Sequence, residues 1–598
     1  MRVEEGYQPV PYIEGNPYAA DPVLPSLLKR LFPSKVLEEV EGDLERFGNV
    51  VLTELRALTG VSHPPRVVQY NQWGQRVDDL QTSEGWRALK SAAHREGMVG
   101  IFYERKFREH SRVYGFAKML LAVGDTQVIF CPISMTDGAA RVIELIGTPE
   151  MKRDIYPRLI SRDPSFAFTA GQWMTERPGG SDVSRTETTA MPIAGPGTPY
   201  GPNYRLDGFK WFSSATDSDV SLVLARTGMP EDGSRALSLF LVPLRYPLLR
   251  EPSAPRPSAT SNNIFIHRLK NKVGTQLVPT AELSLAGAEG FLLGKLNEGV
   301  RLITPVLNIT RVHSSLSSIG NLRKCLAIAT AYSTVRKIKS GTQPLSDQPL
   351  HVAELAKVSV LYRALVHFVF GAIVLLGKTE CGVATQEEEL RLRLLTPAIK
   401  AFAADKACAA MEECMTALGG EGYMVENGFG TCIQDALVEK IWEGTITVLS
   451  LDLVRAASKS KALDAFLVWA RTILSSCPAS LRGKLREPLE ALHAACDDLS
   501  QTYKAPIAPL VPRPALFLFS HIASSLYLLE HAIWAHQKSE VSSSSDIEVF
   551  RRWVVEGGLS LAVENVRRAK TSPTDRSQMD SEIVYSPSTH AATKQARL

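Results

Sequence analysis

A glycine-rich loop over residues 174–182 is the first segment whose residue types could do chemistry. It reads Met174-Thr175-Glu176-Arg177-Pro178-Gly179-Gly180-Ser181-Asp182. Two adjacent glycines let the backbone approach a ligand closely. The hydroxyls of Thr175 and Ser181, with the amides beside them, can bond the edge of a flat heteroaromatic ring or a phosphate. An ordinary Gly-Ser loop between two strands would contain the same residues, so both interpretations stay open at this point.

A second segment combines an indole with a hydroxyl. It reads Tyr204-Arg205-Leu206-Asp207-Gly208-Phe209-Lys210-Trp211-Phe212-Ser213-Ser214, and its Asp207-Gly208 pair is typical of a turn between extended runs. In a strand, Trp211 and Ser213 would share one face because side chains alternate. A ring and a hydroxyl on one face suit a planar cofactor, with the ring packing and the hydroxyl bonding a ring nitrogen. The alternative is a tryptophan that only fills a core.

A single carboxylate in apolar surroundings marks the third segment. Glu443 lies in Ile441-Trp442-Glu443-Gly444-Thr445-Ile446-Thr447. A poorly solvated carboxylate has a raised pKa, so Glu443 could act as a base near neutral pH. The alternative is a glutamate at a helix N-terminus that interacts with backbone amides.

The remaining candidate is a glycine turn, and two other kinds of site are excluded. Leu418-Gly419-Gly420-Glu421-Gly422-Tyr423 follows a helical run and could be only a helix C-cap. The nearest approach to G-x-G-x-x-G, residues 195–201, is rich in proline and precedes no helix, which excludes a Rossmann nucleotide site. The eight cysteines form no C-x-x-C pair, so we expect no metal site.

The rest of the chain must supply the elements that position these segments. Apolar residues at 3/4 spacing, as in Leu27-Leu28-Leu31-Phe32, predict helices before residue 166, with Cys131 to Thr136 as a punctuated stretch between two of them. Short β-rich runs at 221–225, 237–242 and 264–266 predict an antiparallel β domain. The expected regions are an N-terminal helical domain (residues 1–165), a middle β domain (166–290), a helical bundle (291–455), an extra helical domain (456–570) and a flexible tail (571–598).

In this order, the four segments resemble those of the acyl-CoA dehydrogenase superfamily. The loop at 174–182 resembles its M-T-E-x-x-x-G-S-D flavin loop, and Gly208 to Ser213 its G-x-K-W-[IF]-[TS] strand. Residues 443–445 resemble its catalytic E-G-T, and residues 419–422 its G-G-x-G turn. The AidB-like branch is indicated by Pro64-Pro65, Tyr70, Gly74 to Asp79, Cys131-Pro132-Ile133, Trp442, and Leu451-Asp452 through Arg455. The resemblance covers residues 60–455 and implies an α+β, mostly α fold with an extra C-terminal helical domain.

The resemblance implies FAD as cofactor and the α,β-dehydrogenation of an acyl-CoA. Glu443 would remove the α-proton, and flavin N5 would accept the β-hydrogen as hydride. The cofactor-binding residues it implies are Met174, Thr175, Gly180, Ser181, Trp211, Ser213, Gly419, Gly420, Thr445 and Thr447. The substrate-binding residues are Ser181, Arg311 and Gly444. The alternative base position carries Thr310, which cannot act as a base.

Three stretches depart from the family pattern. The family's R-x-x-F-G stretch is replaced by Arg336-Lys337-Ile338-Lys339-Ser340-Gly341, which alters a contact to the FAD of a neighbouring subunit. The K-x-G-x-R stretch appears as Lys272-Val273-Gly274-Thr275-Gln276, with glutamine for arginine. Thr447 stands where the family usually has glutamine. These changes bear on how firmly FAD is held.

Partners and two further functions follow from the same resemblance. A homotetramer or homodimer is expected, because the family shares its FAD site between subunits. One alternative function is an AidB-like flavoprotein that binds nucleic acid, since Arg455 matches a DNA-contact arginine proposed in AidB. The charge is too weak to favour it: +4 overall, with 17 Lys and Arg against 14 Asp and Glu over residues 456–598. The other is a non-catalytic acyl-CoA sensor, which would have no need of Glu443.

The two ends and the longest apolar run bear on localisation. The final Ala596-Arg597-Leu598 fits the small-basic-leucine form of a peroxisomal signal. We therefore expect a peroxisomal protein, with the cytoplasm as the alternative. Residues 1–9 do not form a signal peptide. The run from Ala364 to Gly377 is too short to span a bilayer, so it predicts a buried helix and no membrane span.

Overall fold

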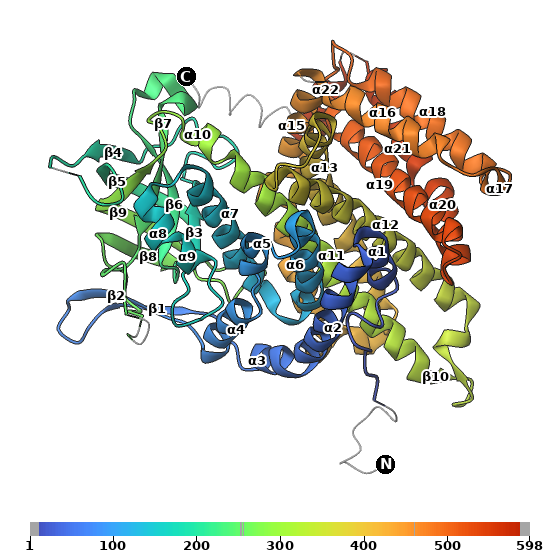
Figure 1. Ribbon diagram of the computed structural model, residues 1–598, viewed down its shortest axis with the longest axis horizontal. Coiled ribbons are helices and arrows are strands. Elements are labelled where there is room, and N and C mark those ends of the chain that lie inside the picture. Colours follow the sequence, from blue (N-terminus) through green and yellow to red (C-terminus); the bar gives the residue numbers. More distant parts are fainter. Residues whose placement is uncertain are drawn as a thin grey trace.

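The computed structural model describes residues 11–195, 197–251, 254, 256–459, 461–573 and 575–585. Along the chain, helices are followed by a sheet, then by long helices, then by a further group of helices. Figure 1 shows the sheet at one side of the molecule, the long helices in the middle and the last helices at the other side. The expected order of domains is therefore confirmed.

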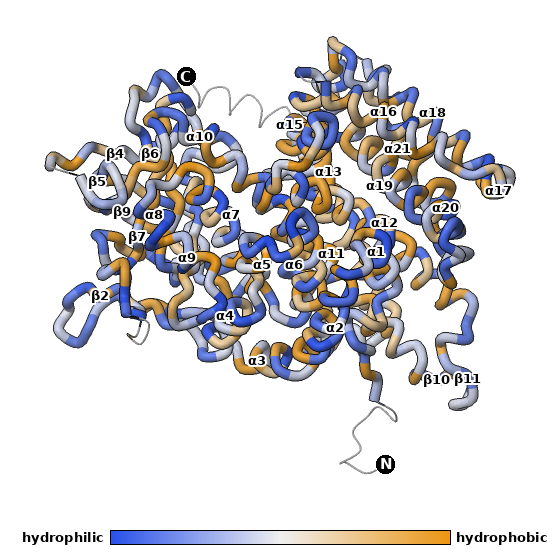
Figure 2. The backbone as a smooth tube through the Cα atoms, viewed as in Figure 1, coloured by the Kyte–Doolittle hydropathy of each residue, from blue (hydrophilic) through white to orange (hydrophobic). Residues whose placement is uncertain are grey.

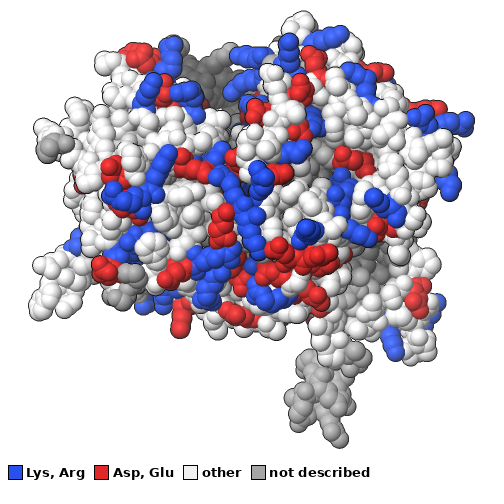
Figure 3. All heavy atoms as spheres, viewed as in Figure 1, with Lys and Arg blue, Asp and Glu red and all other residues white. Residues whose placement is uncertain are grey.

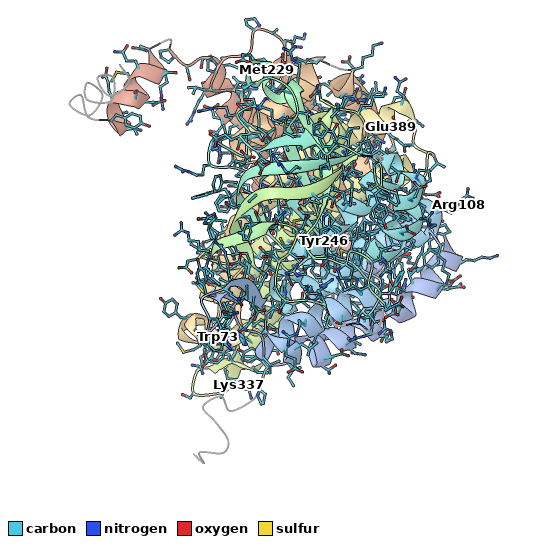
Figure 4. The ribbon with its side chains drawn as sticks, turned by 90° about the vertical axis from the view of Figure 1, so that its left-hand side faces the viewer. Trp73, Arg108, Met229, Tyr246, Lys337 and Glu389 are labelled. Carbon is cyan, nitrogen blue, oxygen red and sulfur yellow. The ribbon has the colours of Figure 1, made fainter. Side chains whose placement is uncertain are left out.

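The N-terminal region is helical apart from one ribbon. Its helices are α1 (Leu24–Leu31), α2 (Ser34–Val50), α3 (Arg56–Gly60), α4 (Glu84–Arg95), α5 (Gly100–Glu104), α6 (Ser111–Ala122), α7 (Phe130–Ile146), α8 (Pro149–Asp154) and α9 (Tyr156–Leu159). The ribbon pairs β1 (Arg66–Tyr70) with β2 (Arg76–Gln81) in an antiparallel register. Its tip carries Trp73, which is 78% exposed and lies toward the lower edge of Figure 4.

The punctuated stretch Cys131 to Thr136 proves to be helical, because it forms the start of α7. Pro132 occupies the third position of this helix. A proline is tolerated there because the first-turn N–H groups have no partner inside the helix. The proline therefore marks the beginning of a helix and not a break between two.

A seven-stranded sheet forms the middle domain. Its strands are β3 (Ala170–Trp173), β4 (Thr189–Pro192), β5 (Asn203–Ser214), β6 (Val220–Arg226), β7 (Leu237–Pro243), β8 (Ile264–Leu269) and β9 (Thr280–Leu293). The order is β3-β6-β4-β5-β9-β7, with β8 paired to β9 and β6 also paired to β7. Most pairs are antiparallel as expected, but β6 runs parallel to both β3 and β4. One face packs around a core that includes Trp173, Val223 and Phe240.

The Asp207-Gly208 pair does not form the predicted turn. β5 continues through it, with a register shift against β9 between Leu206 and Asp207. Gly208 has φ +155°, and a Cβ there would lie 2.5 Å from Oγ1 of Thr188. The extra residue at this register shift is Gly287 of β9 (φ +82°), so β5 pairs past a β-bulge in its neighbour.

Long helices form the bundle that follows. They are α10 (Gly299–Leu302), α11 (Thr304–Val335), α12 (Pro349–Glu380), α13 (Gln386–Thr416), α14 (Phe429–Leu437) and α15 (Ile446–Lys459), with a small β10–β11 hairpin (Lys337–Ile338 and Gln343–Pro344) between α11 and α12. Thr385 begins α13 with a capping box, since it bonds the backbone of Glu388 and is bonded in return. Figure 2 shows the apolar residues of these helices gathered in the interior of the molecule.

The extra helical domain packs on this bundle. It comprises α16 (Ala462–Ser475), α17 (Ala479–Arg482), α18 (Arg486–Thr502), α19 (Pro512–Gln537), α20 (Ser543–Glu556) and α21 (Leu559–Lys570). One apolar core runs continuously from the bundle into it, through residues such as Phe402, Phe466 and Phe519. Within the segment expected to be a flexible tail, Arg576–Val584 forms a further helix, α22. Residues 586–598, which include the predicted peroxisomal signal, lie outside the described residues.

Two helices are long and apolar enough to cross a bilayer, judged by length and composition. They are α12 and α19. Their most apolar windows are 67% and 89% buried inside the protein. Core helices of a large bundle have the same composition, and the run from Ala364 to Gly377 lies within the first of them, as the sequence predicts.

Candidate active site

The predicted flavin loop lies against the end of β5. The backbone N–H of Trp211 donates to the carbonyl oxygen of Thr175 at 3.0 Å. Glu176 is buried, and Nζ of Lys210 donates to its Oε1 at 2.6 Å. Two segments that are about 30 residues apart in the sequence are thereby joined side by side, as a shared binding surface requires.

The Lys210–Glu176 pair is the anchor of this junction. Both side chains are almost fully buried, and Lys210 also donates to the carbonyl of Leu224 at 2.8 Å. Burial raises the pKa of Glu176, but the charge and hydrogen bond of Lys210 outweigh it and hold that pKa below its ordinary value. Removing one partner would leave the other as an uncompensated buried charge, which is strongly destabilising.

The residues at this surface fit a planar cofactor. Trp211 is half-buried, and the ammonium of Lys270 lies 3.2 Å from the centre of its ring. Oγ of Ser213 is buried and has no hydrogen-bond partner among the residues that the structure describes. A buried hydroxyl without a partner is unfavourable unless a ligand completes it. Gly180 is exposed, and a Cβ there would lie 2.6 Å from Oγ1 of Thr175. A larger residue would therefore collide with Thr175, whereas glycine leaves the backbone open to a ligand.

A register shift interrupts the strand between Lys210 and Ser213. Regular alternation therefore does not by itself fix the directions of Trp211 and Ser213. Ser213 is fully buried, in contrast to the half-buried Trp211. Of the other predicted flavin residues, Met174 is half-buried and Ser181 is exposed beside Gly180.

Glu443 lies in a tight turn just before α15. Its φ is +55° and that of Gly444 is +103°. A positive φ is uncommon for a residue with a side chain, and such strain often accompanies a functional role. Oγ1 of Thr310, on α11, donates to Oε2 of Glu443 at 2.5 Å. The position that the sequence excludes as a base thus holds the carboxylate of the predicted one.

The surroundings of Glu443 adjust its pKa in both directions. Burial raises the pKa above the ordinary value of a glutamate. The hydrogen bond from Thr310 and the charges of Arg311 and Lys400 oppose this rise. A carboxylate with a raised pKa that stays partly ionised is suited to accept a proton near neutral pH.

Lys400 is a charged residue at this site that the sequence analysis did not select. It is buried on α13, and its Nζ donates to the carbonyl oxygen of Gly444 at 2.7 Å. Burial lowers its pKa to about 8. A lone lysine in the apolar run Ala398-Ile399-Lys400-Ala401-Phe402 was the signal that could have identified it.

Glu439 is a second such residue, four positions before Glu443. It is 3% exposed, and its Oε2 accepts hydrogen bonds from the hydroxyl of Ser314 and from Nε1 of Trp442. Burial raises its pKa to about 8, against the opposing effects of Ser314, Trp442 and Lys400. The i to i+4 spacing of two glutamates could have indicated that they lie close together.

Arg311 lies beside the catalytic turn and is held by an ion pair. Its Nη1 is 2.8 Å from Oδ2 of Asp452 on α15, and Arg393 on α13 binds the same carboxylate. Nε of Arg311 is buried, and none of the described residues bonds it. Its predicted role in substrate binding would therefore use an arginine that is already fixed in place.

The remaining predicted residues fall into two groups. Thr445 accepts a hydrogen bond from the N–H of Val448 at 3.4 Å, which caps α15, whereas Thr447 is exposed.

Gly419 and Gly420 lie beyond the end of α13, where a Cβ would meet nothing within 4 Å. Sixteen residues of α13 separate Lys400 from Thr416, which corresponds to about 24 Å along the helix. The glycine turn is therefore remote from the catalytic turn of its own chain.

The middle domain reaches the bundle close to this turn. The N–H of Thr275 donates to Oδ1 of Asp435 on α14 at 2.6 Å, and a Cβ on Gly274 would collide with the backbone of Gln434. Cys131 on α7 lies between the two regions. Burial raises the pKa of its thiol, and both Glu439 and Glu443 add to that rise.

Comparison with known protein families gives matches from residue 7 to residue 458. Residues 297–458 match the acyl-CoA dehydrogenase C-terminal domain, and residues 171–288 match the acyl-CoA dehydrogenase middle domain. Residues 7–164 match the N-terminal domain of the adaptive response protein AidB. The chain therefore belongs to the acyl-CoA dehydrogenase superfamily, on its AidB-like branch. This is a class of FAD-dependent oxidoreductases, and FAD is the cofactor expected here.

Individual relatives extend the similarity through the extra helical domain. The chain is 37% identical to acyl-CoA dehydrogenase family member 11 of Caenorhabditis elegans, over 95% of this chain and 91% of that protein. The crystal structure of Caenorhabditis elegans ACDH-11 in complex with C11-CoA superposes with a TM-score of 0.87 at 36% identity, covering 97% of both chains. An acyl-CoA dehydrogenase from Bacillus anthracis, complexed with FAD, shares the fold at 18% identity, with a TM-score of 0.69 and coverage of 95% and 94%.

Proposed function

We propose that this chain catalyses the FAD-dependent α,β-dehydrogenation of an acyl-CoA, with Glu443 as the base. The observation that carries the proposal is the placement of Glu443. Its carboxylate lies in a strained turn, held by Thr310 and surrounded by Arg311 and Lys400. A base near neutral pH needs a raised pKa and a fixed position, and this arrangement supplies both.

Different residues of the chain would bind the cofactor, accept the proton and stabilise the developing charge. Glu443 would accept the α-proton of the thioester at its carboxylate. The backbone N–H of Glu443 would stabilise the negative charge that develops on the thioester oxygen, as donors fixed before the reaction do. Thr175, Trp211 and Ser213 would hold the flavin edge. When bound, FAD supplies the acceptor for the β-hydrogen, which leaves as hydride.

An anaerobic titration tests this function. Purified protein with bound FAD is mixed with saturated acyl-CoAs of increasing chain length, and flavin absorbance is followed. We expect one class of chain length to bleach the flavin, and Glu443→Gln to lose the bleaching by at least about 100-fold while it retains FAD. Exposed Glu412→Gln on α13 is the control. Flavin that no acyl-CoA bleaches would overturn the proposal in favour of a sensor or a nucleic-acid-binding flavoprotein.

We also propose that the chain assembles as a homotetramer or homodimer. Tyr423 and Val425, beside the glycine turn, are 80% and 84% exposed. Exposed apolar residues of this kind are typical of an interface, and the turn is remote from the catalytic turn of its own chain. Light scattering should therefore give a multiple of 65.6 kDa. A monomer that retains FAD would overturn this.

Peroxisomal localisation is a further proposal, based on Ala596-Arg597-Leu598. A fluorescent fusion at the N-terminus should enter peroxisomes, and removal of these three residues should leave it in the cytoplasm. In that compartment, oxygen could re-oxidise the flavin, which hydrogen peroxide release would measure. On the face shown in Figure 3, basic side chains are intermingled with acidic ones, which does not favour nucleic-acid binding there.

A further inference from the structure

A second carboxylate lies next to the proposed base and has no part in the chemistry described above. Glu439 is the middle residue of a 3₁₀ turn (Val438–Lys440) and lies four positions before Glu443. Only 3% of it is exposed. A buried carboxylate is costly unless other groups satisfy it, so its partners indicate what it does.

The partners of Glu439 come from both sides of the catalytic turn. Its Oε2 accepts from the hydroxyl of Ser314, one turn after Thr310 on α11. The same oxygen accepts from Nε1 of Trp442 at 2.5 Å. Thr310 in turn donates to Glu443. Helix α11 therefore presents one hydroxyl to each of the two carboxylates, and Trp442 is tied to Glu439 immediately before the base.

One lysine acts on both carboxylates. Lys400 affects the pKa of Glu439 and of Glu443 alike, and its Nζ bonds the carbonyl of Gly444. The other titratable groups that face Glu439 are the thiols of Cys131 on α7 and Cys408 on α13, whose pKa values burial raises. Near neutral pH these thiols carry no charge. Glu439 therefore shares the cation of Lys400 with the base, whereas Arg311, which also acts on Glu443, is paired with Asp452.

We propose that Glu439 is a positioning residue for the base: it fixes Trp442 beside the catalytic turn, and its protonation state sets the ionisation of Glu443. This inference rests on the proposed function. While Glu439 is neutral, Lys400 and Arg311 both favour the ionised form of Glu443. When Glu439 loses its proton, a second negative charge lies beside Glu443 and makes it harder to keep ionised. The pKa of about 8 for Glu439 places this transition near neutral pH.

Two variants separate position from charge. Glu439→Gln keeps an oxygen that can accept from Trp442 but cannot ionise. Glu439→Leu loses both properties and leaves the indole N–H unpaired. We expect flavin reduction to fall about tenfold or more in Glu439→Leu, since small displacements near a reacting group are costly. Glu439→Gln should retain clearly more of the rate at pH 7.

A titration that needs no substrate tests the charge directly. The fluorescence of Trp442, obtained as wild type minus Trp442→Phe, should change with an inflection near pH 8, because its N–H is bonded to the ionising group. Glu439→Gln should abolish the inflection. Ser314→Ala should move it to higher pH, because a donor that stabilises the ionised form is lost. Glu412→Gln, an exposed carboxylate on α13, should leave it in place.

The rate of flavin reduction provides the second readout. In the wild type, its pH profile should contain an inflection that tracks the Trp442 signal, and the profile of Glu439→Gln should lack it. If the two profiles superimpose, or if the fluorescence inflection persists in Glu439→Gln, the inference is wrong. If the fluorescence titrates as expected but no acyl-CoA bleaches the flavin, the coupled pair stands and the proposed function fails.

Discussion

The hydroxyl of Thr310 donates a 2.5 Å hydrogen bond to the carboxylate of Glu443. The two residues are 133 positions apart in the sequence, on α11 and on the turn before α15. The bond fixes one carboxylate oxygen and stabilises the ionised form of the group. Burial acts in the opposite direction. The pKa of the base is therefore set by a balance that single substitutions can shift.

Replacing Thr310 by alanine should raise the pKa of Glu443. A hydrogen bond to a charged group contributes about 1.5–3 kcal/mol, and one pKa unit corresponds to about 1.4 kcal/mol. The acid limb of the rate of flavin reduction should therefore move to higher pH by about one unit or more. Thr310→Ser keeps a hydroxyl and should stay close to the wild type. An acid limb that does not move in Thr310→Ala would show that the bond has no effect on the base.

Breaking the buried pair under the flavin loop should destabilise the protein. Lys210→Met leaves Glu176 as a buried carboxylate without its cation, which costs about 3–5 kcal/mol. The midpoint of urea unfolding should fall, and FAD should be released more easily. The double variant Lys210→Met, Glu176→Gln should recover part of the loss, because no charge is then left unpaired. A double variant less stable than Lys210→Met would argue against this origin of the effect.

The hydroxyl of Ser213 should contribute to FAD affinity. It is buried and lacks a partner within the described part of the chain, so a flavin atom that bonds it would remove an unfavourable state. Ser213→Ala should weaken FAD binding by about tenfold, which is the value of one hydrogen bond. Ser214→Ala is the matched control, because that hydroxyl already bonds Thr280. Equilibrium dialysis measures both, and equal affinities in the two variants would contradict the assignment.

Stability should fall in mildly acidic solution because histidines are buried uncharged. Burial lowers the pKa of His521 from 6.5 to about 3, and that of His531 likewise. The unfolded chain therefore binds protons at these sites between pH 6.5 and 3, whereas the folded chain does not. Each histidine should remove about 1.4 kcal/mol of unfolding free energy per pH unit below 6.5.

A substitution isolates one of these histidines. His521 packs between the rings of Phe402 and Trp553, so His521→Phe keeps an aromatic ring and removes the titration. Urea unfolding at pH 6.5 and 5 should show a smaller loss of stability in His521→Phe than in the wild type. The exposed His493→Gln should keep the full loss. An unchanged pH dependence in His521→Phe would mean that His521 is protonated in the folded state.

Local patterns predicted the elements that they themselves determine. The β-rich runs form β6, β7 and β8, and the helical bundle expected at residues 291–455 contains the long helices α12 and α13. Where a sequence pattern was compatible with two local structures, tertiary packing determined which of them formed. The Asp207-Gly208 pair lies inside β5 and not in a turn, because β9 pairs with β5 on both sides of it. Pro132 lies in the first turn of α7, where a break between helices was expected. Part of the segment expected to be a flexible tail, Arg576–Val584, formed α22. The ends of a helix are not fixed by composition alone.

The sequence by itself determined which residues could do chemistry: Glu443 in its apolar turn, the flavin loop, and Trp211 with Ser213. Their types and order were enough to indicate the class of protein. Only the tertiary structure decided what surrounds the base, because a pKa depends on groups that are distant in sequence and close in space. Thr310, Lys400 and Glu439 come from three different elements. Their charges and hydrogen bonds meet at the catalytic turn only after the bundle has folded.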